Sequence, residues 1–372
     1  MTVRANKPAF NIREKLKELT HNIGLKGREL MRAGTAQDAR DLVSAGRKNL
    51  IQNGAMNVWQ RGTAQDTIAS GREFLADRWG VATAGSAQLT HEQSTDSPPG
   101  FTYSLKVSPA VTDTLSSSEQ SHITQLIEAQ NMTFLNWGSA EGIPITISFW
   151  AKSNQTSNKC LWLYAQDAGD HIARQFNLSK PNVWEKFTFT IPPNPGGVIA
   201  NDNGPGLYVR IALDGGHTVA NGSLPTEWTN VTATGRYGTL DPGFLENTAN
   251  EFYLTGVQLE AGKNATDFEH RSYAEELALC QRYYVEDSTG GADDPLMYFF
   301  QYSDSYKMLQ IPFPVPMRSS GRTVVITMGS GAGNTGLTQN YQPTAMQYKA
   351  YVNIALNSTA SYIVKYRADD EF

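Results

Sequence analysis

Residues 252–262 read FYLTGVQLEAG, and residues 268–284 read FEHRSYAEELALCQRYY. The first stretch has the composition of a strand, and in the second Leu277, Cys280 and Tyr284 recur at helical spacing. We expect the closing strand of a β-sandwich, followed by a short helix over residues 274–284 that packs one β-domain against the next. Glu269 and His270, at the exit of the strand, are predicted to be structural rather than catalytic.

Period-2 patterns precede this stretch. Aliphatic residues alternate with polar or aromatic ones in residues 145–150, 161–164, 187–191 and 207–213, and Gly- and Pro-rich turns separate these segments. Asn53 and Gly54 form a strong tight-turn dipeptide. The prediction is a mainly β fold, with an antiparallel jelly-roll-type β-sandwich over residues 49–270.

The overall composition agrees with this fold class. The 372 residues include 32 Gly and 17 Pro, and only 18% are charged, which favours β architecture over helical bundles. There is no apolar run of 18 residues, so membrane insertion is not expected. The first residues also lack the apolar core of a signal peptide.

The segment after the sandwich predicts a second unit. Residues 271–284 form the helical connector, and residues 286–294 are acidic and Gly-rich, as at a domain boundary. Strand-like segments then recur as far as residue 368. We therefore expect a smaller C-terminal β-domain over residues 285–372.

Residues 1–48 predict a short helical N-terminal arm with basic character. Residues 1–49 carry eleven Lys and Arg against five Asp and Glu, a net charge of +6, which leaves −11 for the other 20 basic and 31 acidic residues. Ile12, Leu16, Leu19 and Ile23 form a narrow apolar stripe. The stripe packs either on the body of the same chain or on other copies and a docking partner. An acidic partner is expected, but nucleic acid is not, because the arm lacks interleaved aromatic residues.

Metal and cofactor sites are not predicted. Cys160 and Cys280 have apolar neighbours and are expected to be buried, and the six histidines lack ligand spacing. Loops with Asp167, Asp170 and Asp202 could hold a structural Ca²⁺, although Asx-turns explain them more simply. The sequence has no phosphate-binding loop, dinucleotide-binding turn or nucleophile motif, so no cofactor is expected.

Aromatic residues are the candidate binding side chains, because ligands pack on aromatic faces flanked by polar groups. The candidates on strands and in loops are Trp150, Trp162, Tyr164, Trp228 and Tyr237. Alternatively, the strand aromatics face the second β-domain or a neighbouring subunit. Asp77 and Arg78 are predicted to be a packed, ion-paired group rather than a catalytic one.

No catalytic residue is predicted. Hydrolysis by a pair of acids requires two carboxylates held across a cleft. The available acids are Asp167 with Asp170, Asp202, Asp293 with Asp294, and Asp369 with Asp370. Nothing in the sequence indicates that any pair faces across a groove, so we expect that the protein is not an enzyme.

The order of several motifs over residues 49–372 resembles that of bacteriophage tail-fibre and related virion proteins. The motifs are Asn49-Leu50-Ile51, WQRG at 59–62, ADRW at 76–79, QLEAG at 258–262, FEHR at 268–271, CQRYY at 280–284 and FPVPMR at 313–318. The central part is similar to the carbohydrate-binding-module sandwiches carried by those proteins. The resemblance implies a virion structural protein, commonly a homotrimer, that engages host-surface glycan.

The function expected from this resemblance is that of a phage tail fibre. Its N-terminal arm would attach to other tail or virion proteins, and its sandwich would bind host-surface glycan during adsorption. Two alternatives remain at this stage: a capsid decoration or tail-connector protein without receptor binding, and a glycan depolymerase.

Overall fold

The computed structural model describes residues 49–232, 234–287, 297–298, 300–301, 307–319, 322–328, 337–340, 347–352 and 362–372. The predicted N-terminal arm, with the stripe of Ile12, Leu16, Leu19 and Ile23, lies outside the described residues.

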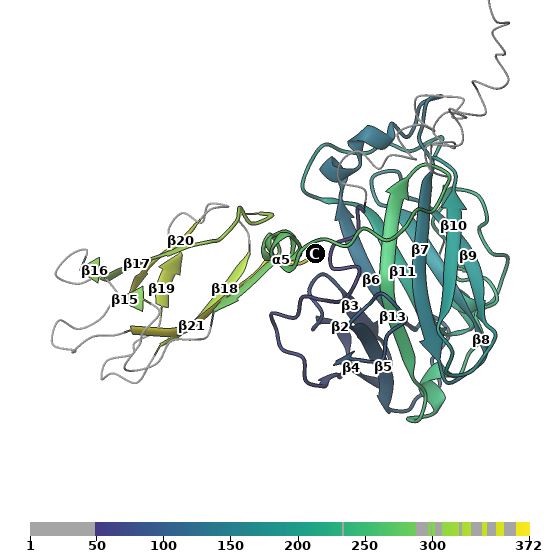
Figure 1. The fold of residues 1–372 in the computed structure, drawn as a ribbon, viewed down its shortest axis with the longest axis horizontal. Coiled ribbons are helices and arrows are strands. Elements are labelled where there is room, and N and C mark those ends of the chain that lie inside the picture. The colour runs from purple at the N-terminus through teal and green to yellow at the C-terminus, as the bar shows by residue number, and fades with distance from the viewer. Residues whose placement is uncertain are drawn as a thin grey trace, which may run out of the picture.

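Two antiparallel sheets face each other and form a sandwich (Figure 1). The six-stranded sheet consists, in spatial order, of β1 (Asp66–Ile68), β4 (Gln88–Ser94), β5 (Ser104–Val111), β13 (Phe252–Ala261), β7 (Ile145–Ser153) and β10 (Glu185–Ile191). The seven-stranded sheet consists of β12 (Thr229–Asn230), β9 (Asp170–Leu178), β8 (Ser157–Ala165), β11 (Pro205–Gly215), β6 (Gln120–Glu128), β3 (Gly80–Thr83) and β2 (Gly71–Phe74). The predicted mainly β, antiparallel sandwich is confirmed.

The main core lies between the two sheets. Ile147 and Phe149 of β7 point inward from one sheet, and Val209 and Ile211 of β11 point inward from the other, all of them buried. Each such side chain contributes roughly 1.5–3 kcal/mol by leaving water. Because neighbours along a strand point to opposite faces, the same alternation places Arg210 on the outer face of its sheet.

Short helical elements occur in the connections of the sandwich. They are the 3₁₀ helices η1 (Ala129–Asn131), η2 (Thr133–Leu135) and η3 (Phe244–Glu246), and the α-helix α4 (His217–Ala220). Residues 49–65 contain no strand. Asn49 fixes this segment to the sandwich, since its side-chain amide donates to the Val257 carbonyl at 3.1 Å and its side-chain oxygen accepts from the Leu259 N–H at 2.9 Å.

The helix α5 (Tyr273–Gln281) lies between the sandwich and the C-terminal strands (Figure 1). It begins with a capping box in which the Ser272 hydroxyl accepts from the Glu275 N–H and the Glu275 side chain accepts from the Ser272 N–H. The predicted helix is thus confirmed, but it ends three residues earlier than expected. Tyr284 does not belong to it and instead begins β14 (Tyr284–Asp287).

The C-terminal strands form two four-stranded sheets. In the first, β14, β21 (Tyr362–Asp369) and β15 (Met297–Tyr298) follow in order, and β18 (Thr323–Met328) also pairs with β21. The second has the order β16 (Phe300–Gln301), β17 (Lys307–Pro312), β20 (Gln347–Val352) and β19 (Leu337–Asn340). A smaller set of β-strands therefore follows the sandwich.

The last residues of the chain return to the sandwich. Arg78 is only 2% exposed, its guanidinium carbon lies 3.4 Å from the centre of the Tyr283 ring, and it pairs with the buried Glu371 carboxylate. The prediction of a packed, ion-paired Arg78 is confirmed. Cys160 and Cys280 are both free and buried, also as predicted.

Candidate functional site

Two tyrosines lie side by side on the outer face of the seven-stranded sheet. Tyr164 of β8 and Tyr208 of β11 are register partners, and their ring centres are 5.5 Å apart. Both side chains are half-buried, so part of each ring meets solvent. Trp162, two residues before Tyr164, stacks on the Tyr164 ring at 5.4 Å with only 15° between the planes. A continuous aromatic surface thus crosses two neighbouring strands.

Two of the predicted binding residues are buried beside this surface and do not reach solvent. Trp162 is 3% exposed and Tyr237 is 0% exposed, which corrects the expectation that their faces are free to stack on a sugar. The physical reason is that the loop carrying Tyr237 and Leu240 folds back over Trp162 and forms a second, smaller apolar core. The loop that covers Trp162 therefore belongs to the same domain, and not to the C-terminal unit.

Polar groups fix the buried tryptophan and tyrosine. The Trp162 indole N–H donates to His171 Nδ1 at 2.9 Å. The Tyr237 hydroxyl accepts from Arg210 Nη1 at 3.0 Å and also donates to the Gln120 side-chain oxygen. The aromatic surface therefore rests on side chains whose polar atoms are satisfied.

Three arginines surround these rings. The guanidinium carbons of Arg210 and Arg236 lie 4.8 Å and 5.4 Å from the centre of the Trp162 ring, as in cation–π contacts. The Nε groups of both arginines are buried, and neither has a hydrogen-bond acceptor among the described residues. None of the ion pairs found within the described ranges involves Arg72, Arg210 or Arg236.

Arg72 reaches the same face from β2, at the edge of the sheet. Its side chain crosses β3 at Gly80, where a Cβ atom would lie 2.6 Å from Arg72 Cδ. The Arg72 guanidinium donates to an oxygen of Phe372, the last residue, and lies 5.4 Å from the Phe74 ring centre. Only a glycine at position 80 therefore leaves room for Arg72 in this position.

The pKa shifts at this face reflect burial together with clustered positive charge. Burial lowers the pKa of Arg72, and the neighbouring Arg210 lowers it further. Burial also lowers the pKa of His122 well below its usual value, with Arg210, Arg72 and Arg236 acting in the same direction. Burial raises the pKa of Tyr208, while Arg72 and Arg210 oppose the change. The face thus holds cationic groups close together around a neutral Tyr208.

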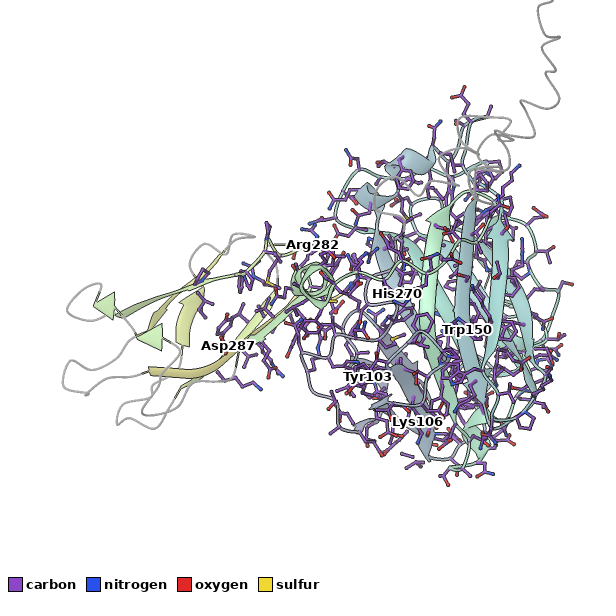
Figure 2. All side chains as sticks on the ribbon, viewed as in Figure 1. Tyr103, Lys106, Trp150, His270, Arg282 and Asp287 are labelled. Carbon is purple, nitrogen blue, oxygen red and sulfur yellow. The ribbon has the colours of Figure 1, made fainter. Side chains whose placement is uncertain are left out.

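Trp150 lies on the other sheet. Figure 2 shows Trp150 and His270 on the same face of the sandwich. A Cβ at Gly256 would lie 2.9 Å from Trp150 and 2.7 Å from Phe101, so both rings cover this glycine. Phe101 in turn contacts Phe268 at 5.0 Å between ring centres. This half-buried cluster packs the segment after β13 onto the six-stranded sheet.

Trp228 lies at a third location. Its ring centre is 5.2 Å from that of Trp137, and its indole N–H donates to the Pro192 carbonyl at 2.8 Å. Trp137 lines a pocket of about 340 Å³ together with the loop around Val198, whose side chain is 67% exposed. Of the five predicted aromatics, the structure thus brings Trp162, Tyr164 and Tyr237 together, and Trp150 and Trp228 lie elsewhere.

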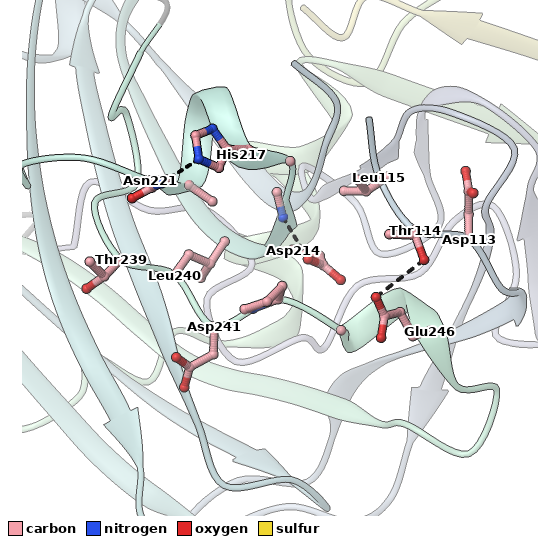
Figure 3. Close-up of a pocket in the computed structure, with 15 residues that line it drawn as sticks. Asp113, Thr114, Leu115, Asp214, His217, Asn221, Thr239, Leu240, Asp241 and Glu246 are labelled. Atoms are coloured by element: carbon pink, nitrogen blue, oxygen red, sulfur yellow. Dashed lines mark hydrogen bonds between the residues drawn. The ribbon is translucent and has the colours of Figure 1, made fainter. Parts of the chain in front are cut away.

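A pocket of about 390 Å³ opens between loops at one end of the sandwich (Figure 3). The residues that line it include no phenylalanine, tyrosine or tryptophan. Four carboxylates line it: Asp113, Asp214, Asp241 and Glu246. The pocket therefore offers hydrogen-bond acceptors but no ring on which a pyranose could stack.

The carboxylates of this pocket are largely occupied by the backbone. Asp214 accepts from the Gly215 N–H at 2.8 Å and from the Leu245 N–H at 2.9 Å, and burial raises its pKa. Asp241 accepts from the Asn158 N–H at 2.7 Å. These contacts hold neighbouring loops together, so we assign the acids a structural role.

The other candidate acids also have structural partners. Asp202 accepts from the Gly204 N–H at 2.9 Å, the Asx-turn expected for it. Asp167 accepts from the Ala200 N–H at 2.9 Å, and Asp170 accepts from the Asn194 and Asn230 side chains. Asp369 pairs with Arg61 at 3.4 Å and Asp370 with Arg318 at 3.2 Å, whereas Asp293 and Asp294 lie outside the described residues.

Within the described ranges, no group of three or more His, Cys, Asp or Glu side chains is placed to hold a metal ion. In the same part of the chain, no helix is long and apolar enough to cross a membrane.

Four residues of this face were not among the predicted binding residues: Tyr208, Arg210, Arg236 and Arg72. A signal existed for Tyr208 and Arg210, because the alternation in residues 207–213 places both on the outer face. Arg236 lies in a loop and Arg72 on a distant edge strand, and no local pattern relates either of them to Trp162.

The sequence matches no protein-family model, and no curated protein matches it. Among solved structures, the chain is similar to the enzymatically active domain of tailspike protein 4 of bacteriophage CBA120, with 12% identity and a TM-score of 0.30 over 57% of this chain. The match spans only 21% of that tailspike chain.

Two other solved structures are similar to this chain at a comparable level. One is a family 61 carbohydrate-binding module in complex with β-1,4-galactotriose, with 10% identity and a TM-score of 0.30 over 58% of this chain and 99% of that one. The other is a xylan-binding domain of Paenibacillus barcinonensis Xyn10C, with 12% identity and a TM-score of 0.27 over 55% of this chain and 99% of that one. Similarity at this level does not transfer a function to this chain.

Proposed function

We propose that the sandwich is a glycan-binding module and that the sugar lies on the outer face of the seven-stranded sheet. The observation that carries this proposal is the pair of half-buried rings of Tyr164 and Tyr208, which lie 5.5 Å apart beside the guanidinium group of Arg210. No other surface of the described residues combines adjacent tyrosine rings with arginine donors in this way.

The chemistry of a sugar suits this surface. One face of a pyranose presents C–H groups, which pack on an aromatic ring, and its rim presents hydroxyls, which accept from N–H donors. Tyr164 and Tyr208 supply the rings, and the arginines supply donors. Because Trp162 stacks on Tyr164 and is itself packed against Tyr237, the Tyr164 ring is held in place and little rotamer entropy is lost on binding.

We further propose that this module belongs to a phage tail fibre that adsorbs to host-surface glycan. In this proposal the N-terminal arm attaches the protein to other virion proteins, and the protein acts as a homotrimer in the virion. Support comes from the motif order over residues 49–372 and from the excess of basic residues in residues 1–49. Light scattering of the full chain tests the trimer, since a monomer at micromolar concentration contradicts it.

Glycan binding is tested by titrating the full-length protein with oligosaccharides released from host surfaces. Tyr164→Ala and Tyr208→Ala are each expected to weaken binding about 5- to 30-fold, the effect of losing one aromatic anchor. Trp150→Ala is the matched control, because Trp150 is also a half-buried aromatic residue but lies on the opposite sheet. The control variant should bind as the unchanged protein does.

Two results contradict the proposal. If the full chain binds no host oligosaccharide, glycan binding is wrong. If Trp150→Ala loses binding while both tyrosine variants keep it, the binding face is wrong and the six-stranded sheet takes its place.

We propose that the bound glycan is not cleaved. Support comes from the candidate acids Asp167, Asp202 and Asp370, which are engaged by backbone N–H groups or by arginine. Incubation with host polysaccharide should release no reducing ends. Their release, and its loss in Asp202→Asn, would instead favour a depolymerase.

A further inference from the structure

We propose that the glycan recognised on the outer face of the seven-stranded sheet is anionic, and that Arg72, Arg210 and Arg236 bind its carboxylate or sulfate-ester groups. This inference rests on the proposed glycan-binding function. It adds the chemical class of the sugar and the residues that select it.

The first observation is charge without a partner. Arg78, Arg282 and Arg318 each pair with a carboxylate of the described residues. Arg210 and Arg236 have no such pair, although both side chains are half-buried, whereas Arg72 contacts an oxygen of the last residue, Phe372, and lies near enough to the Glu371 carboxylate to be influenced by it. Enclosing positive charge without an anion is costly, and a bound anion would offset that cost.

The second observation is the supply of free donors. A guanidinium carries five N–H donors, and two of them can bind one carboxylate in a bidentate pair. Arg72 donates to an oxygen of Phe372, the last residue, and Arg210 uses Nη1 for Gln120 and Tyr237. Arg236 makes no hydrogen bond with a described residue. Most donors of the three groups therefore remain for a ligand.

The third observation is convergence from three parts of the chain. Arg210 comes from β11, Arg236 from the loop over Trp162, and Arg72 from β2 across Gly80. All three lie close enough to His122 to affect it: burial lowers the pKa of His122, and the three arginines lower it further. The groups thus concentrate positive potential next to Tyr164 and Tyr208.

The charge of the rest of the molecule favours an acidic sugar over nucleic acid. Outside residues 1–49 the chain carries 20 basic and 31 acidic residues, a net charge of −11. A long polyphosphate would extend over this acidic body and be repelled by it. A short acidic oligosaccharide carries only a few charges, and those can meet the local arginines.

The decisive comparison uses the unchanged full-length protein and isothermal titration calorimetry. The probes are a linear galacturonic acid tetramer, its fully methyl-esterified form, a sulfated galactan oligosaccharide of equal length and the neutral galactan. The acid and sulfated oligomers should each bind at least about tenfold more tightly than their uncharged counterparts. The preference should shrink at high salt, because screening weakens interactions between exposed charges.

Single-residue variants test which residues produce the preference for the acidic oligosaccharides. Arg72→Gln, Arg210→Gln and Arg236→Gln should each reduce the acid-to-ester ratio of affinities, whereas Tyr164→Ala should weaken both probes equally. Gly80→Ala should act like Arg72→Gln, because a Cβ at this position displaces the Arg72 side chain. Arg174→Gln is the control: Arg174 is also half-buried without an ion pair in the described ranges, but it donates to the Ala173 and Thr226 carbonyls.

The outcomes separate this inference from the proposed function. Equal affinity for acid, sulfated and neutral oligomers overturns the anionic preference and leaves glycan binding in place. If no oligosaccharide in this set or from host surfaces binds, glycan binding itself fails. Tighter binding of single-stranded DNA than of the galacturonic acid tetramer also overturns the inference, since the partner would then be a nucleic acid.

Discussion

His91 is a buried histidine whose ring nitrogens have no hydrogen-bond partner among the described residues. It lies on β4 with 1% of its surface exposed, opposite Asp66 of β1 and Val107 of β5. Burial lowers the pKa of His91 to about 4, and the Asp66 carboxylate only partly opposes this. The native state therefore holds His91 neutral, while the unfolded chain takes up a proton near pH 6.5.

This difference predicts a loss of stability in acid. Between about pH 6.5 and pH 4 the unfolded state binds the extra proton, so the free energy of unfolding should fall by roughly 3 kcal/mol from this residue as the pH decreases through that window. His91→Leu removes the titrating group and should lose correspondingly less stability. Urea unfolding at pH 7 and pH 4 measures the difference. His270→Gln, at an exposed position, is the control, and parallel pH profiles for His91→Leu and the unchanged protein would show that His91 is not responsible.

At the scale of secondary-structure elements, the turn at Asn53 and Gly54 fastens the chain before β1 to β13. Asn53 adopts a positive φ of 53°, and its side-chain oxygen accepts from the Asn57 and Val58 N–H groups at 2.8 and 2.9 Å. Gly54 then packs directly on β13, where a Cβ would lie 2.1 Å from the Val257 carbonyl oxygen. The turn depends on both residue types.

A substitution pair tests this contact. Gly54→Ala forces a backbone atom of β13 to move, so we expect a loss of about 3 kcal/mol in the free energy of unfolding. Gly196→Ala is the matched control, because the nearest atom to its new Cβ would be 3.8 Å away, and it should change stability by about 0.5 kcal/mol or less. Urea denaturation measures both variants. Equal effects would mean that the Gly54 contact is not specific.

The strands that were predicted from sequence are those with one aliphatic face. β7, β8, β10 and β11 show the alternation plainly, whereas β6 was not predicted. In β6 the inward position between Ile123 and Ile127 is Gln125, which is buried because its side chain hydrogen-bonds with both the N–H and the carbonyl of Gln52. A polar residue in a strand usually predicts a position that faces solvent, but here hydrogen bonds to a distant segment allow it to be buried. A local sequence pattern carries no information on such contacts.

The same limit applies to the candidate site. The alternation of side chains along a strand correctly places Trp162 and Tyr164 on one face of β8. It does not reveal that the loop of Tyr237 covers Trp162 and leaves Tyr164 half-buried, since that depends on packing between distant segments. Arg72 reaches the site across Gly80, which has no Cβ in its path and lies two strands away from Arg210 in the sheet.

At the scale of the whole molecule, the sandwich and the C-terminal strands are joined by buried charges. The chain leaves α5 through Tyr283 and returns through Asp370, whose N–H donates to the Tyr283 carbonyl at 2.8 Å. The Glu128 carboxylate accepts from Arg282 at 2.6 Å and from the Tyr283 hydroxyl, and the Arg282 contact helps to lower its pKa despite burial. Since Phe372 also accepts from Arg72, the C-terminal residues border the proposed ligand face.

The pair of Arg78 and Glu371 tests how strongly this junction contributes to stability. Their side chains are 2% and 3% exposed, so Glu371→Gln leaves a buried guanidinium without its carboxylate, and we expect a loss of about 3–5 kcal/mol in the free energy of unfolding. Glu92→Gln is the matched control: Glu92 pairs with Lys106 at 3.1 Å where the side chains are 31% and 23% exposed, so its loss should be about 1 kcal/mol or less. Urea unfolding gives both values, and hydrogen exchange should show β21 opening more readily in Glu371→Gln alone. If the two substitutions cost the same, the buried pair does not hold the C-terminal residues to the sandwich, and the packing of Arg78 on Tyr283 must do so instead.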